Sequence, residues 1–173
     1  MKILDATCGD RSMWYLKKYP LATYMDIRQG KFVVKSKNCK LEDMRTIEVK
    51  PDVISEWKDA PFPDNHFDMV IFDPPHKIAK RGSETCGLEI RYGRLFSENW
   101  RQELQIGIKK LFDVLKPEGI FIFKWCETDK PVTDVLSLFP YPPVFGTRTG
   151  QSNKNHWIVF IKYRLDKTLM EGT

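Results

Sequence analysis

One stretch constrains the fold more than any other: the run FDMVIFD at residues 67–73. It is almost continuously apolar, and the segment DAPFPDN at 59–65, rich in turn-forming residues, precedes it. A short apolar run bounded by turn signals is typical of a strand that is covered on both faces, as in a parallel sheet. We therefore expect residues 67–73 to form a central strand of a mostly parallel sheet.

The rest of the chain alternates between strand and helix patterns. Apolar runs predict further strands over 2–5, 21–27, 52–55, 120–126 and 156–163. Apolar residues at helical spacing predict helices over 11–19, 97–119 and 131–139, with Ser97 as a possible N-cap of the second. Residues 31–50 predict a hairpin or an irregular insertion. Strands that alternate with helices imply an α/β, doubly wound, mostly parallel seven-stranded sheet with helices on both faces. The last strand is expected to pair with residues 143–149 as an antiparallel edge pair.

Composition excludes several classes of protein. A chain of 173 residues with 42% hydrophobic residues is long enough for one core, so we expect a single domain over 1–173. The four cysteines form no C-x-x-C pair, so we expect free thiols and no metal site. No apolar stretch approaches the roughly 20 residues that cross a bilayer, so we expect a cytoplasmic protein without a membrane partner. The formal charge of +5 is compatible with a polyanionic partner.

The most distinctive residues follow three of the expected strands. They are the segment DATCGD at 5–10, then Asp26, then the tip Asp73-Pro74-Pro75-His76. Gly9 lets backbone approach a ligand closely, and an acid about 20 residues further on suits ribose hydroxyls in a nucleoside-binding fold. Open parallel sheets bind ligands at the carboxyl ends of their strands, so we expect these residues to share one site.

In this order and spacing, the sequence resembles the class I S-adenosylmethionine (SAM) dependent methyltransferases, which have a Rossmann-like fold. The matching motifs are ILDATCG at 3–9, Asp26, DAPFPDNHFDMVIFDPP at 59–75 and LKPEG at 115–119. Within that family the chain looks closest to amino-methyltransferases with a D-P-P-[YFWH] tip, in particular small stand-alone enzymes of phages and prophages. The resemblance implies SAM as the cofactor, bound by Asp5, Ala6, Thr7, Cys8, Gly9, Asp26, Ile27, Asp59, Ala60 and Phe62. Asp59 occupies the position that contacts the cofactor adenine in this family.

The Asp-Pro-Pro-His tip indicates chemistry on an exocyclic amine. The lone pair of a nucleobase amine is delocalised into the ring, so acceptors must hold its hydrogens while the nitrogen becomes tetrahedral. Asp73 supplies a carboxylate, and Pro75 holds Pro74 out of a helix so that its carbonyl is a second acceptor. Both would stabilise positive charge that develops only as the methyl group transfers. Asp73, Pro74 and His76 are therefore the candidate catalytic residues.

Two positions depart from the family pattern. The loop after the first strand lacks the common second glycine, since it reads Gly9-Asp10-Arg11. His76 stands where the family usually has an aromatic residue that stacks on the target base. We expect His76 to stack on the substrate or to form a hydrogen bond with it.

Residues 77–96 form a polar connection that we interpret as a substrate loop, with a solvated loop as the alternative. Its basic and aromatic residues could contact phosphates and stack on bases. The candidate substrate-binding residues are Pro75, Lys80, Arg81, Arg91, Tyr92 and Arg94.

The sequence thus predicts methyl transfer from SAM to an exocyclic amine of a nucleic-acid base. Adenine N6 in DNA or RNA is the leading target, before cytosine N4 and guanine N2, and the base would be flipped out or single-stranded. Two alternatives stay open. One is a small-molecule N- or O-methyltransferase, and the other is a SAM-binding partner subunit without activity. Recognition sequence and oligomeric state are not predicted.

Overall fold

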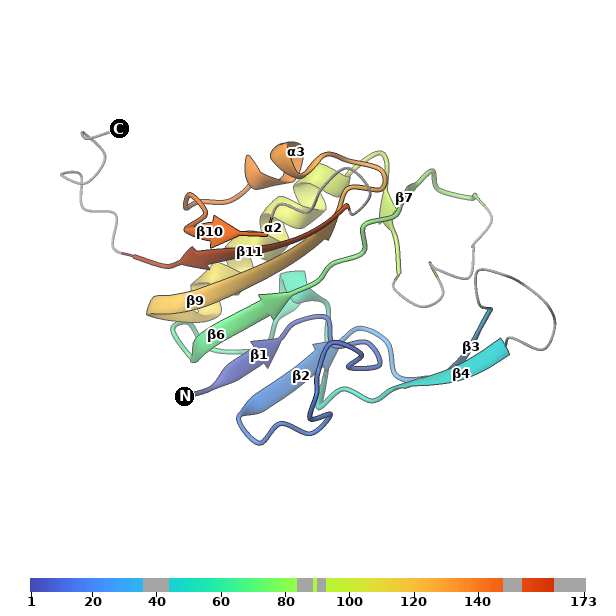
Figure 1. Cartoon of the computed structure of the whole chain (residues 1–173), viewed down its shortest axis with the longest axis horizontal. Coiled ribbons are helices and arrows are strands. Elements are labelled where there is room, and N and C mark those ends of the chain that lie inside the picture. The colour runs from blue at the N-terminus through green and yellow to red at the C-terminus, as the bar shows by residue number, and fades with distance from the viewer. Residues whose placement is uncertain (36–43, 84–88, 90–92, 148–153, 164–173) are drawn as a thin grey trace.

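The computed structural model describes residues 1–35, 44–83, 89, 93–147 and 154–163, and its centre is a seven-stranded sheet of order β10-β11-β9-β6-β1-β2-β5 (Figure 1). The strands of this sheet are β1 (Ile3–Asp5), β2 (Ala22–Asp26), β5 (Val53–Ile54), β6 (Phe67–Phe72), β9 (Leu115–Cys126), β10 (Phe145–Gly146) and β11 (Asn155–Ile161). β5, β2, β1, β6 and β9 pair in parallel, whereas β11 is antiparallel to both β9 and β10. The expected mostly parallel sheet with an antiparallel edge pair is confirmed.

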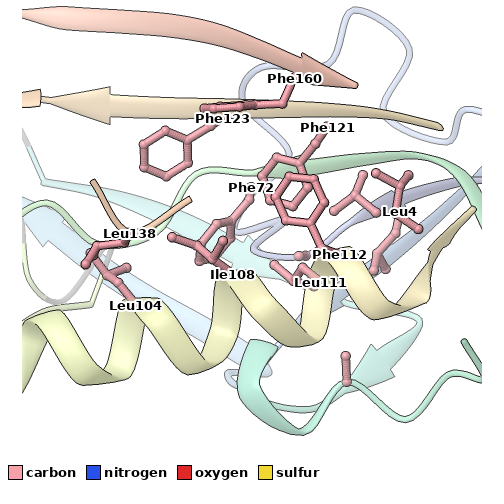
Figure 2. Packing of buried hydrophobic residues seen from close by; sticks show 14 of the residues in the cluster. Leu4, Phe72, Leu104, Ile108, Leu111, Phe112, Phe121, Phe123, Leu138 and Phe160 are labelled. Carbon is pink, nitrogen blue, oxygen red and sulfur yellow. The ribbon is translucent and has the colours of Figure 1, made fainter. Parts of the chain in front are cut away.

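The main core lies between one face of this sheet and the helix α2 (Trp100–Val114). Figure 2 shows Ile108 and Leu111 of α2 pointing toward Phe72 of β6 and Phe121 of β9, and these four side chains are fully buried. Leu104, one turn earlier on α2, lies beside Leu138 and is fully buried too. Burying a side chain of this size contributes about 1.5 to 3 kcal/mol. The short helices η2 (Trp57–Asp59) and α3 (Val132–Leu136) pack against the same cluster, through Trp57 and Val135 among others.

The helix predicted over 11–19 is wrong, because this segment forms turns. Arg11 has a φ of 55°, which breaks a right-handed helix at its first residue. The Trp14 indole N–H donates to Asp5 Oδ2 over 2.7 Å, and the Trp14 ring packs edge-on against Tyr24, with centroids 5.2 Å apart. These contacts hold the segment against the second face of the sheet as a turn structure.

Two further boundaries differ from the sequence prediction. The helix predicted over 97–119 begins at Trp100, so Ser97 is not its N-cap, and Asn99 stands at that position without a side-chain capping bond. The helix ends at Val114, and β9 starts directly at Leu115, which has an extended backbone. Pro117 explains the early end, because proline disfavours helical backbone in the residue before it and lacks the N–H that a helix requires.

Two small sheets lie outside the main one. β3 (Gly30–Lys35) and β4 (Met44–Val49) pair antiparallel, which confirms a hairpin within 31–50, and the hairpin extends away from the sheet beyond the end of β2 (Figure 1). β7 (Ile78–Ala79) and β8 (Leu95–Phe96) pair in parallel within the predicted substrate loop. None of the helices in the described ranges is long and apolar enough to span a membrane.

A glycine on α2 allows η2 to pack closely, and this contact gives a first prediction. A Cβ on Gly107 would lie 2.0 Å from Cδ1 of Trp57, so Gly107→Ala must displace the indole. Overpacking of this kind costs about 1 to 3 kcal/mol. We expect urea denaturation to show a loss of that size in the free energy of unfolding for Gly107→Ala. The exposed neighbour variant Gln105→Ala serves as the control and should stay within about 0.5 kcal/mol of wild type.

Candidate functional site

The carboxyl ends of β6, β1 and β2 lie side by side, and they bring three carboxylates to one edge of the sheet. Asp5 ends β1, Asp26 ends β2, and Asp73 follows β6. A cavity of about 210 Å³ opens beside them. It is lined by Thr7, Cys8, Gly9, Asp10, Ser12, Met13, Asp26, Ile27, Arg28, Glu56, Trp57, Asp73, Pro75, Gly93 and Arg94.

Asp26 ties the loop after β1 to the end of β2. Its Oδ2 accepts the backbone N–H of Gly9 over 2.9 Å, and Gly9 has a φ of 50°. Arg28 donates to the same carboxylate three times, through its backbone N–H and Nε to Oδ1 and through Nη2 to Oδ2. Both oxygens of Asp26 thus accept two hydrogen bonds each. A ligand hydroxyl that binds Asp26 must take the place of an Arg28 donor.

Arg11 stands where the family pattern has a second glycine, and its backbone has the left-handed conformation that glycine favours. Its φ of 55° lies in the left-handed region, where a non-glycine residue costs of order 1 to 3 kcal/mol. The guanidinium offsets this cost, because it donates to the carbonyls of Lys17 and Lys50 over 2.9 and 2.6 Å. It also lies 3.6 Å above the ring centroid of Tyr24. A side chain therefore anchors the loop where the family pattern has a glycine.

Burial raises the pKa values of two side chains at the end of β1, Asp5 and Cys8. Desolvation raises the pKa of Asp5 to about 7, against the hydrogen bonds from Trp14 and Thr7, and the nearby charges of Asp73 and Asp26 raise it further. Burial also raises the pKa of the Cys8 thiol to about 12, so Cys8 is an inert packing residue at neutral pH.

Asp73 stands at the wall of the cavity and is held by three neighbours. Its backbone N–H donates to the Thr7 hydroxyl over 3.0 Å, which joins the ends of β6 and β1. Lys124 of β9 donates to Asp73 Oδ2 over 2.6 Å. His76 Nε2 lies 3.4 Å from Asp73 Oδ1, but Oδ1 has no hydrogen-bond partner among the described residues. Oδ1 is buried beside His76, so a ligand hydrogen can reach this unused acceptor only if the carboxylate or the imidazole turns.

His76 packs against the far side of this carboxylate. Its ring meets Trp125 edge-on, with centroids 5.5 Å apart, and its Nδ1 is buried without a described hydrogen-bond partner. Burial lowers the pKa of His76, so the imidazole is neutral at pH 7. Asp129 fixes the next turn of chain, since it accepts the backbone N–H of Ile78 over 2.7 Å and pairs with Lys77.

The structure brings many of the sequence-predicted residues together. Thr7, Cys8, Gly9, Asp26, Ile27, Asp73, Pro75 and Arg94 line the cavity, and Asp5 and Ala6 are buried directly beneath it. Pro74 is buried and His76 lies beside Asp73. Lys80 and Arg81 are exposed on the predicted substrate loop, whereas Arg91 and Tyr92 lie outside the described residues.

Besides the buried Asp5 and Ala6, three predicted cofactor residues do not line the cavity. Asp59 is exposed at the end of η2, Ala60 is buried, and Phe62 packs against Phe67 with ring centroids 4.9 Å apart. Glu56 and Trp57 of the same segment occupy the cavity wall instead. Sequence reasoning also missed Arg28 and Met13. All four lie within four residues of a predicted site residue. They would have been found by including the residues next to each motif as candidates.

Comparison with known proteins supports the fold alone. No protein-family model and no curated protein matches the sequence. A solved structure of the Pyrococcus horikoshii protein PH0226 is 17% identical with a TM-score of 0.57, and the match covers 94% of this chain and 82% of that one. The 1,6-didemethyltoxoflavin-N1-methyltransferase of Burkholderia thailandensis, solved with S-adenosylhomocysteine, is 13% identical with a TM-score of 0.52, covering 94% and 71%. An rRNA methylase from Streptococcus thermophilus is 10% identical with a TM-score of 0.50, covering 94% and 86%. The chain has the Rossmann-like fold of class I methyltransferases.

The raised pKa of Asp5 predicts how stability changes with pH. Because the folded-state pKa of about 7 exceeds the unfolded value of 3.8, the folded chain binds the proton more tightly. The stabilisation is complete below about pH 4 and is lost as the pH rises to 7. We expect the free energy of unfolding to fall between pH 5 and pH 8 by on the order of 2 kcal/mol more in wild type than in Asp5→Asn. Equal pH slopes in urea denaturation would show that Asp5 does not titrate in this range.

Proposed function

We propose that the chain is a SAM-dependent methyltransferase that acts on an exocyclic amine of a nucleic-acid base. One observation carries the proposal: Asp73 lines the same cavity as the Gly9 loop and Asp26. A carboxylate, which can only accept hydrogen bonds, thus meets a site whose loop and acid suit a nucleoside.

The residues of the cavity fit SAM as the cofactor. SAM carries a sulfonium and an ammonium, and the carboxylates of Asp26, Glu56 and Asp73 line the cavity, each with a basic partner that a cationic ligand could replace. The Gly9 loop would hold the amino-acid end, and Asp26 would hold the ribose once the Arg28 guanidinium moves aside. Trp57 offers an aromatic face for the adenine. When bound, SAM supplies an electrophilic methyl group.

The tip of β6 fits an amine acceptor. Each oxygen of a carboxylate accepts about two hydrogen bonds, and Lys124 uses one of the four positions on Asp73. Asp73 would hold the amine hydrogens while the nitrogen forms its bond to the methyl carbon and the carbon–sulfur electron pair stays on sulfur. The new ammonium then loses one proton, which the Asp73 carboxylate that holds its hydrogen can accept directly, and the neutral imidazole of His76 lies 3.4 Å behind that carboxylate.

The loop from β7 to β8 supports a polyanionic substrate. Lys80 and Arg81 are exposed there, and the guanidinium of Arg81 lies 4.6 Å above the ring centroid of Phe96. Basic groups interleaved with aromatic rings suit single-stranded nucleic acid.

One observation favours the small-molecule alternative. Arg94, which lines the cavity, lies 3.7 Å from the buried carboxylate of Glu89, so part of the loop charge is neutralised. The neighbours of known activity act on both substrate classes, a small molecule and rRNA.

Substitution of the two acids should separate cofactor binding from methyl transfer. Asp73→Ala should bind SAM within a few fold of wild type but transfer methyl groups at least about 100-fold more slowly. Asp26→Ala should instead weaken SAM binding by about 10-fold or more, because it removes an acceptor for ribose hydroxyls. Calorimetric titration and transfer of a labelled methyl group measure the two quantities. Asp68→Ala, at the opposite end of β6, is the control that should change neither. Equal losses of binding and transfer in Asp73→Ala would contradict its role.

The substrate class can be tested through the exposed charges. In assays with single-stranded DNA and RNA, the double variant Lys80→Gln and Arg81→Gln should weaken binding to any sequence by a similar factor. The slope of log affinity against log salt should fall by about 1 to 2, since each phosphate contact releases counterions. Methylation of a metabolite that is independent of salt and of both substitutions would move the assignment to a small-molecule enzyme.

A further inference from the structure

Asp73 also contacts a residue that does not line the cavity, Lys124 of β9. Lys124 and Trp157 are paired residues of β9 and β11, so their side chains lie next to each other on one face of the sheet. The Lys124 ammonium lies 2.6 Å from Asp73 Oδ2 and 5.7 Å from the ring centroid of Trp157. Asp73, Lys124 and Trp157 therefore form a continuous row from the cavity to the open face of the sheet.

This row remains accessible. Trp157 is 36% exposed, and the Lys124 side chain keeps 23% of its surface. The face around them is apolar, since Val159 and Ile161 continue it along β11 and Ile120 and Ile122 along β9. Because the Lys124 ammonium lies over the Trp157 ring, a flat aromatic group that stacks on that face must shift the ammonium toward its own edge.

The chemistry of the row matches one kind of ligand edge. Asp73 is an acceptor and Lys124 is a donor, and they stand side by side. A ring nitrogen next to an exocyclic amine presents the complementary pair, an acceptor beside a donor, as adenine N1 and N6 or cytosine N3 and N4 do. The Asp73–Lys124 pair has no net charge, so a cationic alkylamine gains little there, while a neutral heteroaromatic amine satisfies both groups.

We propose that Lys124 and Trp157 complete the substrate subsite, in which Trp157 stacks on a heteroaromatic ring and Lys124 donates to the ring nitrogen next to the amine held by Asp73. This inference rests on the proposed function and deepens it, because it gives the substrate a planar ring with an amidine-like edge. Trp157 then supplies the stacking surface that the family pattern places at position 76. Lys124 is a specificity-determining residue.

The test uses protein saturated with S-adenosylhomocysteine, so that the cofactor cavity is occupied. Adenosine is compared with 1-deazaadenosine, which keeps the amine and the fused rings but lacks the ring nitrogen. We expect wild type to bind adenosine at least about 10-fold more tightly, the effect of losing one hydrogen bond from a charged donor. Lys124→Met should reduce this ratio to near one, and Lys124→Arg should restore part of it.

A matched control is available on the same two strands. Lys116 of β9 pairs with Asp68 of β6 over 2.8 Å at the other end, so Lys116→Met breaks an equivalent ion pair and should leave the ratio unchanged. Stacking is measured by tryptophan fluorescence, which adenosine should quench in wild type and much less in Trp157→Phe. Ile161→Ala, on the same face of β11, should quench as wild type does.

The outcomes separate this inference from the proposed function. A wild-type ratio near one, or a ratio that Lys124→Met leaves intact, overturns the subsite even if nucleic acid is methylated. Single-stranded oligonucleotides with one adenine or one 1-deazaadenine identify the source of the ring. If only free nucleosides show the Lys124-dependent ratio, the subsite stands and the nucleic-acid substrate is wrong. If neither nucleosides nor oligonucleotides bind, both are wrong.

Discussion

The parallel pairing of β6 with β1 on one side and β9 on the other is the constraint on which the site depends. It places Val70 and Phe72 against α2 and, through the alternation of side chains, directs Asp73 toward the opposite face. Lys124 comes to the same face because Phe123 and Phe72 are register partners. One register thus fixes both the core and the polar groups at its edge, and a slip of one residue would exchange them.

The loop after β1 shows how a side chain can replace a glycine. The left-handed backbone at Arg11 is maintained by a guanidinium that spans from Lys17 to Lys50 and lies over Tyr24. The same interactions hold residues 11–19 as turns. The loop shape is therefore fixed by contacts from several elements, whereas a glycine would adopt it from local preference alone.

Charge at the strand ends is balanced unevenly. Lys124 neutralises Asp73 and Arg28 neutralises Asp26, whereas Asp5 is buried and accepts only neutral donors. This difference explains why the pKa of Asp5 is raised to about 7. A cationic ligand in the cavity would meet two carboxylates that are already paired and would lie near a third, the buried Asp5, whose ionisation it would favour. Cofactor binding and proton release would be coupled in this arrangement.

The sequence alone determined the strands and the edge at which they end. Apolar runs with turn signals on either side placed β1, β2 and β6 within a few residues, because a strand buried on both faces requires such a run. The order of the motifs placed Asp5, Gly9, Asp26 and Asp73 at neighbouring strand ends, which the structure brings together around one cavity. Only the tertiary structure decided the conformation of residues 11–19, since their helical spacing is overridden by contacts of Arg11 and Trp14 with distant residues. It also decided the partners of Asp73. Lys124 is 51 residues away in the chain, and no local pattern can reveal a pairing that depends on strand register.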